Sequence, residues 1–213
     1  MNSQALLDEA IHQLSEESAA FTQTGEFDSA IELWTKFLVD HPTCGQAYLE
    51  RAAVRAQQGE DGRSMLEDYR KAALLEPDDA HIQFAYHFTF AGALHAAFVD
   101  EQEQTLLEQA IQQYDLAVAA MPDHPQAFEL RGTAYCLLGE VEAALNDLNE
   151  AIELRPHSTI ARFMRATVHH EHGRLAQAKD DYEVVFELQD RIDPSMSEKL
   201  EERYAELMAE LLG

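Results

Sequence analysis

Three histidines within four consecutive residues are the strongest candidates for metal chemistry in this sequence. His169 and His170 are followed by Glu171 and His172. Residues three apart share one face of a helix, so His169 and His172 could converge on a metal ion. The sequence has no HExxH pattern, however, and no second cluster of Asp or Cys at ligand spacing. We therefore expect packed or solvated histidines and no metal site, with an adventitious metal site as the alternative.

Phosphate binding and nucleophilic catalysis lack their usual patterns. The glycine pair in Gly59-Glu-Asp-Gly62 is acidic and falls in a predicted turn between helices, where a phosphate would be repelled. There is no GxSxG motif. Carboxylate pairs such as Asp180 and Asp181 are most simply solvated helix faces. The sequence thus predicts no catalytic residue, no cofactor and no enzymatic activity.

The charge balance narrows the class of partner. The 213 residues include 40 acidic and 15 basic side chains, for a net charge of −25, yet 46% are hydrophobic, which indicates a folded chain. Nucleic acids and anionic membrane surfaces attract clustered Lys and Arg, so neither is an expected partner. Two cysteines are too few for a disulfide framework, and residues 1–10 lack the pattern of a secretion signal. These features predict a cytoplasmic location.

A repeat must position whatever binding residues the chain has. Four columns recur in one register: a large residue, an alanine or aromatic residue three positions later, a proline five positions after that, and glycines 34 residues apart. The prolines are Pro42, Pro77, Pro122 and Pro156, and the large residues are Trp34, Tyr69, Tyr114 and Leu148. Ala, Leu, Glu and Gln dominate between them, which favours helices.

These columns resemble the tetratricopeptide repeat (TPR) family, whose repeat consists of 34 residues in two antiparallel helices. The best copy spans residues 125–158 and holds Phe128, Gly132, Tyr135, Ala144, Leu148, Ala151 and Pro156 in the family's order. The resemblance implies an all-α, right-handed α-α superhelix of about five helix-turn-helix repeats in a single domain, 1–213. The repeats are predicted at 11–44, 45–79, 80–124 (atypical), 125–158 and 159–192, with a capping helix at 194–212.

Eleven helices follow from the repeat register and from the Gly and Pro positions. Their expected ranges are 4–23, 27–39, 45–57, 62–75, 79–98, 102–120, 125–137, 141–154, 158–171, 175–190 and 194–212. In the last of these, Leu200, Tyr204, Leu207 and Leu211 form one apolar stripe, as a helix that covers the final repeat requires.

The third repeat is anomalous. It is 45 residues long, contains no Lys or Arg, and carries Phe84, Tyr86, Phe88 and Phe90 at alternate positions. We expect a lengthened first helix and a turn extended around residues 99–104. Since a spacing of two distributes rings around a helix, two interpretations remain open: a helix buried on nearly all sides, or an aromatic floor for a bound peptide.

The resemblance also implies which residues line the concave groove, because the family uses fixed positions of each first helix. The predicted groove residues are Glu16, Glu50, Tyr86, Phe90, Glu129, Leu130, Thr133, Leu137, Phe163 and Met164. The groove is therefore expected to be acidic toward its N-terminal end and apolar toward its C-terminal end. Acidic side chains would orient a partner protein or peptide that carries a basic segment.

A subclass of the family binds the C-terminal carboxylate of a peptide through Lys and Asn at the fifth and ninth positions. Here those positions hold the pairs Ser15/Ala19, Leu49/Ala53, Glu129/Thr133 and Phe163/Thr167. No carboxylate clamp is therefore expected. Arg51, Arg131 and Arg165 share the seventh position, where we expect structural arginines paired with nearby Glu.

The function that the sequence predicts is a non-enzymatic adaptor that binds a peptide or partner protein in its groove. Two alternatives remain open: an acidic cytosolic chaperone for a secreted or assembly-prone client, and a self-assembling scaffold. The sequence leaves the oligomeric state undecided.

Overall fold

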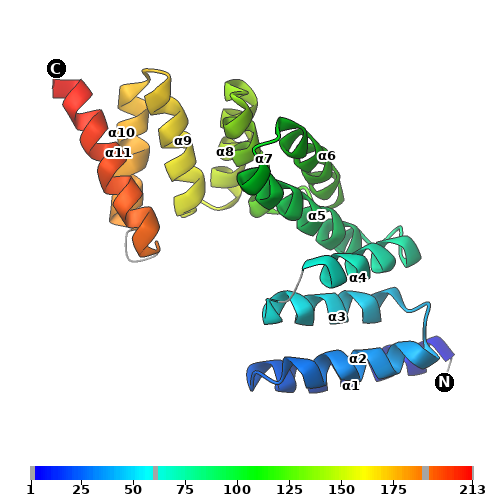
Figure 1. Cartoon of the computed structure of the whole chain (residues 1–213). Coiled ribbons are helices and arrows are strands. Elements are labelled where there is room, and N and C mark those ends of the chain that lie inside the picture. Colours follow the sequence, from blue (N-terminus) through cyan, green and yellow to red (C-terminus); the bar gives the residue numbers. More distant parts are fainter. Residues whose placement is uncertain (1–2, 60–61, 189–191, 213) are drawn as a thin grey trace. The chain divides into compact units, whose positions relative to one another are not determined.

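The computed structural model describes residues 3–59, 62–188 and 192–212, and in this part of the chain every element is a helix (Figure 1). The helices are α1 (Ser3–Gln23), α2 (Phe27–Asp40), α3 (Gly45–Gln58), α4 (Gly62–Leu75), α5 (Ala80–Glu101), α6 (Gln104–Ala120), α7 (Pro125–Leu138), α8 (Val141–Leu154), α9 (Thr159–Glu171), α10 (Leu175–Glu187) and α11 (Pro194–Leu212). The predicted all-α class is confirmed, and most predicted helix ends lie within one or two residues of the observed ones.

Proline and glycine set the connections, as the sequence predicts. Each proline of the repeat column is the second residue of a four-residue turn, in which the fourth residue's N–H donates to the first residue's carbonyl oxygen. The N···O distance is 3.1 Å from Cys44 to His41 and 3.0 Å from Ser158 to Arg155. Gly59 and Gly139 adopt left-handed φ angles of 74° and 78° directly after α3 and α7, where glycine ends a helix without strain.

The chain divides into two compact units, residues 1–93 and 94–213, and the division falls within α5. The single domain expected over 1–213 stays a prediction. In unit 1, α1 packs on α2, α2 on α3 and α3 on α4. Trp34 is fully buried in this core, and its indole N–H donates to Ser18 Oγ at 3.0 Å. The first half of α5 contributes Ile82, which packs with Ala72 and Ala73 of α4.

In unit 2, α6 packs on α7, and the hairpins α7–α8 and α9–α10 follow. At Gly132 helices α7 and α8 approach closely, since a Cβ atom there would lie 3.1 Å from Leu148 Cγ. Helix α11 buries Leu200 and Leu207 against Tyr182 of α10. The apolar stripe predicted for the capping helix is therefore confirmed at these two positions, while Leu211 is exposed.

Three predicted connections differ from the structure or fall outside the described residues. Helix α5 continues to Glu101, so the turn expected around residues 99–104 shrinks to Gln102 and Glu103. Gln102 ends the helix with a left-handed φ of 58°, and its backbone N–H donates to Phe98 O at 2.7 Å. Residues 60–61, part of the acidic Gly59–Gly62 turn, lie outside the described residues, as do 189–191, on which the predicted end of α10 falls.

Candidate functional site

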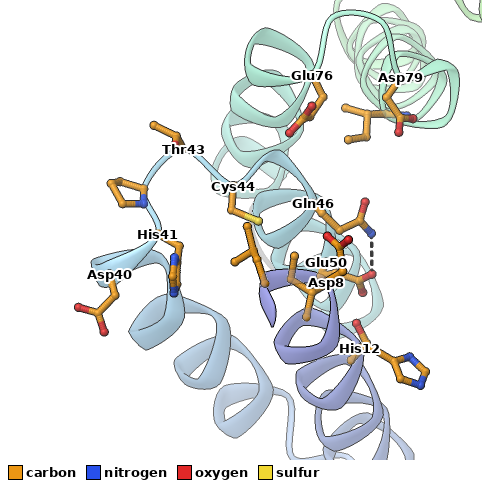
Figure 2. Close-up of a pocket in the computed structure, with 15 residues that line it drawn as sticks. Asp8, His12, Asp40, His41, Thr43, Cys44, Gln46, Glu50, Glu76 and Asp79 are labelled. Carbon is orange, nitrogen blue, oxygen red and sulfur yellow. Dashed lines mark hydrogen bonds between the residues drawn. The ribbon is translucent and has the colours of Figure 1, made fainter. Parts of the chain in front are cut away.

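The clearest hollow in unit 1 is a cleft of about 720 Å³, here called the acidic cleft (Figure 2). Its walls come from one face of α1, the turn before α3, the first turns of α3, the turn after α4 and the start of α5. The lining residues are Leu7, Asp8, Ile11, His12, Ser15, Asp40, His41, Pro42, Thr43, Cys44, Gln46, Glu50, Glu76, Asp79 and Ile82. Five of these are carboxylates and none is Lys or Arg.

The repeat geometry explains why carboxylates gather in this cleft. The turns after α2 and α4 occupy equivalent positions in successive repeats, and the second one carries Glu76 and Asp79. Asp79 caps α5, since its Oδ1 accepts the N–H of Ile82 at 3.0 Å. Gly45 opens α3 without a side chain, and a Cβ there would lie 2.3 Å from Glu76 Cγ. The glycine therefore lets Glu76 lie against the start of α3.

Two predicted groove residues, Glu50 and Glu16, have different surroundings in unit 1. Glu50 lines the acidic cleft, and its Oε1 accepts a hydrogen bond from Gln46 Nε2 at 2.9 Å. Glu16 is exposed on α1, and its Oε1 lies 3.7 Å from Nε2 of His12, which lines the cleft. Our sequence reasoning missed Asp40, Glu76 and Asp79, because the family's positions cover only first helices. The recurrence of acidic residues beside Pro42 and Pro77 was the signal available.

Tyr86 and Phe90 of α5 are half-buried, so this helix is not buried on all sides at these two positions, and their role in peptide binding stays a prediction. Their rings stack with centroids 6.0 Å apart. Tyr86 packs against the cluster around Ile82, and both rings also line a small cleft of about 240 Å³ beside α4. Arg63 and Arg70 flank that cleft. The two rings thus face α4 as well as solvent.

Apart from Glu129, the predicted groove residues of unit 2 are exposed or half-buried. Leu137 of α7 is 48% exposed, and Ile160 at the start of α9 is similarly open. Leu130, Phe163 and Met164 are half-buried. The Phe163 ring packs on Tyr182, with centroids 5.8 Å apart, so part of its surface belongs to the core. Thr133 and Thr167 occupy equivalent positions in successive repeats. Their hydroxyl groups donate hydrogen bonds to backbone carbonyl oxygens of their own helices, at 2.8 Å and 2.9 Å.

The prediction that Glu129 lines the groove is wrong. It is only 3% exposed, and its carboxylate accepts hydrogen bonds from Ser158 Oγ and, at 3.0 Å, from Arg155 Nη2. Because the carboxylate is buried and already has a cationic partner, it fixes α7 to the turn before α9. It cannot orient a partner as expected from its position in the repeat.

The three arginines at the seventh position form what we call the arginine ladder: Arg51, Arg131 and Arg165. Each donates two hydrogen bonds to a buried Asp on the second helix of its own repeat, with distances of 2.7 to 2.8 Å. Each also donates Nη1 to a side chain on the preceding second helix; these acceptors are Thr35, Asp115 and Asn149. The arginines are structural, as predicted, but their partners are Asp and not Glu.

Charge pairing within the ladder alters the acid–base behaviour of its arginine in α7. The hydrogen bond from Arg131 to Asp147 raises the pKa of this guanidinium, and Asp115 raises it further. Asp68 and Asp181 each have a second guanidinium, from Arg55 and Arg162. Arginine side chains of the protein itself therefore neutralise the buried carboxylates of Asp68, Asp147 and Asp181, so these groups need no cation from a ligand.

The three clustered histidines lie on either side of the end of α9: His169 and His170 are in the helix, and His172 follows it. His170 is buried, with Nε2 3.3 Å from Glu210 Oε1 of α11, whereas His172 Nδ1 lies 2.8 Å from Val168 O. Partial burial lowers the pKa of His169. Over residues 3–59, 62–188 and 192–212, no group of three His, Cys, Asp or Glu side chains is arranged to hold a metal ion. Within the same residues, no helix is both long and apolar enough to cross a bilayer.

Comparisons with known proteins agree with this repeat architecture. The tetratricopeptide repeat family profile matches residues 16–82, 95–156 and 138–185. DnaJ homolog subfamily C member 3 of Rattus norvegicus is 37% identical over 95 residues, which are 45% of this chain and 18% of that protein. Protein O-mannosyl-transferase TMTC1 of Mus musculus is 26% identical over 156 residues, which are 73% and 16%. The chain spans less than a fifth of either relative.

Among solved structures, PilW, a type IV pilus biogenesis factor, superposes with a TM-score of 0.72 at 17% identity. The match covers 94% of this chain and 86% of PilW, and at this identity it shows the fold alone. The profile match extends over most of the sequence, and the helix hairpins, proline turns and capping helix are those of the same repeat. The chain therefore belongs to the tetratricopeptide repeat family.

Proposed function

We propose that this chain is a non-enzymatic adaptor that binds a peptide or partner protein on the surfaces formed by its first helices. Proteins of the family generally bind protein partners and are typically non-enzymatic. The observation that carries the proposal is that the first helices α7 and α9 leave apolar side chains open, with Leu137 48% and Ile160 47% exposed, in a chain of net charge −25. A cytoplasmic location is part of the proposal, supported by two free thiols, Cys44 and Cys136.

Other apolar side chains of α7 and α9 support this choice. Leu130 and Met164 are apolar, incompletely covered and carried by the same first helices, α7 and α9. Rigid helices hold such side chains in place before a partner arrives, which reduces the entropy lost on binding. A partner segment that covers them would bury apolar surface, and each Å² buried contributes about 25 cal/mol of favourable binding free energy.

A matched pair of variants tests the proposal. Leu137→Glu places a charge on the proposed binding surface, and Leu116→Glu places the same charge on α6, where Leu116 is 47% exposed. Proteins captured from the source lysate are compared for wild type and both variants, after circular dichroism has shown equal helicity. We expect a partner that is retained by wild type and Leu116→Glu and is lost with Leu137→Glu. Equal capture by all three proteins would refute a binding role for this surface.

A further inference from the structure

Four carboxylates of the acidic cleft differ from the buried carboxylates of the repeats, because arginine side chains of the described residues do not compensate their charge. The buried carboxylates Asp68, Asp147 and Asp181 each have an arginine partner. In the part of the chain that the structure describes, no Lys or Arg lies within ion-pair distance of Asp40, Glu50, Glu76 or Asp79. The contacts of Glu50 and Asp79 are instead neutral donors: the Gln46 amide and the Ile82 backbone N–H.

The cleft also has an apolar component. Leu7 and Ile11 lie on the α1 side, and the fully buried Ile82 lies at the start of α5. Pro42 adds a further apolar surface from the turn before α3. A volume of about 720 Å³ lies within the range of sites that enclose a small ligand or a few side chains. The cleft therefore combines an apolar wall with carboxylates from several elements.

We propose that the acidic cleft binds a partner segment in which lysine or arginine side chains flank an apolar anchor. This inference rests on the proposed adaptor function and specifies the chemistry of the segment bound by unit 1. The anchor lies against Leu7 and Ile11, and the cationic groups reach Asp40 and Glu76 at the two turns and Glu50 on α3. The cationic side chains of the segment compensate the cleft carboxylates, in the same way that arginines of the protein compensate its buried carboxylates.

Charge complementarity selects this occupant over an acidic or neutral segment. A carboxylate brought into the cleft would meet the like charges of Asp40, Glu50, Glu76 and Asp79, and repulsion between like charges at an interface excludes wrong partners. Apolar contact alone would leave the carboxylates partly desolvated without a partner, which is unfavourable. A segment with an apolar anchor and cationic side chains makes favourable contacts with both the apolar and the acidic residues of the cleft.

The probe is a short fluorescein-labelled peptide of alternating Lys and Leu, titrated with the full chain by fluorescence anisotropy. One comparison peptide has Glu in place of Lys, and another has Ser in place of Leu. We expect binding of the Lys/Leu peptide alone, weakening by at least about tenfold between roughly 0.05 M and 0.5 M NaCl because the contact is partly electrostatic. Equal binding of the Lys/Ser peptide would overturn the apolar anchor, and lack of binding by Lys/Leu would overturn the whole inference.

Two triple variants separate the cleft from the overall charge. The cleft variant is Asp40→Asn/Glu50→Gln/Glu76→Gln, and the control removes three exposed carboxylates elsewhere by Glu108→Gln/Glu150→Gln/Glu198→Gln. The cleft variant is expected to weaken binding by about tenfold or more and the control by less than about twofold, since distant exposed charges are screened. Equal losses in both variants would show attraction to the bulk charge and overturn the cleft as the site.

Cys44 gives a positional readout, because it lines the cleft. In a Cys136→Ala background, the bound Lys/Leu peptide is expected to slow alkylation of Cys44. Unchanged alkylation at saturating peptide would overturn the location. The comparison of Leu137→Glu with Leu116→Glu tests the adaptor function independently, with a different partner and a different unit. Failure of the cleft proposal therefore remains distinguishable from failure of the proposed function.

Discussion

Replacing Arg131 by methionine is expected to destabilise the protein more than the same replacement of Arg51 or Arg165. All three side chains hold a buried Asp through two hydrogen bonds. The difference lies in what each Asp keeps after the substitution. Among the described residues, Asp147 has one guanidinium partner, whereas Asp68 retains Arg55 and Asp181 retains Arg162.

The expected magnitude follows from burial. The Asp147 side chain is 5% exposed, and Arg131 is 15% exposed. Removing one partner of a buried pair leaves an uncompensated charge, at a cost of about 3–5 kcal/mol. We therefore expect the free energy of unfolding to fall by about 3–4 kcal/mol in Arg131→Met. Loss of charged hydrogen bonds, with the carboxylate still paired, costs about 1.5–3 kcal/mol, and we expect Arg51→Met and Arg165→Met to lie at the lower end of this range.

Urea denaturation followed by far-ultraviolet circular dichroism measures all three variants. Trp34 fluorescence additionally reports on unit 1, because the chain contains one tryptophan and it lies in that core. The double variant Arg131→Met/Asp147→Leu removes both charges and is expected to recover most of the loss, within about 1–2 kcal/mol of wild type. Three equal losses, or a double variant no more stable than Arg131→Met, would refute this account of the ladder.

Three further predictions concern single side chains. Burial lowers the pKa of His169, so the folded state binds this proton less readily than the unfolded state; stability is expected to fall as pH drops below about 6.5, and His169→Gln should flatten that slope in pH-dependent thermal unfolding. Burial raises the pKa of the Cys136 thiol to about 12, so iodoacetamide at neutral pH should alkylate Cys136 far more slowly than a free cysteine, with rates that become equal after denaturation. Ser18→Ala leaves the buried Trp34 N–H without its acceptor and should cost about 1–3 kcal/mol in urea unfolding; an unchanged midpoint of the Trp34 transition would contradict this hydrogen bond.

Much of the fold could be read from local sequence, because the signals that set it are local. The turns at Pro42 and Pro156 end one helix and begin the next, and glycines such as Gly139 end first helices in a left-handed conformation. Helix α5 shows where the local rule failed. Its end depends on Gln102, a residue that seldom adopts a left-handed conformation, so no glycine marked the position.

The binding surface required more than repeat position. Glu50 and Glu129 both belong to the predicted groove, at the sixth and fifth positions of their first helices, yet Glu50 lines an open cleft and Glu129 is buried. The reason is that Ser158 and Arg155, in the turn before α9, close over the Glu129 carboxylate. No comparable cation reaches Glu50 in the described residues. Packing between successive repeats therefore decides which acids remain available.

The sequence by itself determined the repeat register, the helix order, the structural arginines and the excess of negative charge, since each depends on residue type at fixed spacing. Only the tertiary structure decided that the arginines pair with Asp, and that Tyr86 and Phe90 line a small cleft beside α4. It also decided that Asp40, Glu76 and Asp79 join Glu50 at the acidic cleft. These outcomes depend on side chains brought together from separate turns and helices, and their distances become fixed only when neighbouring repeats pack.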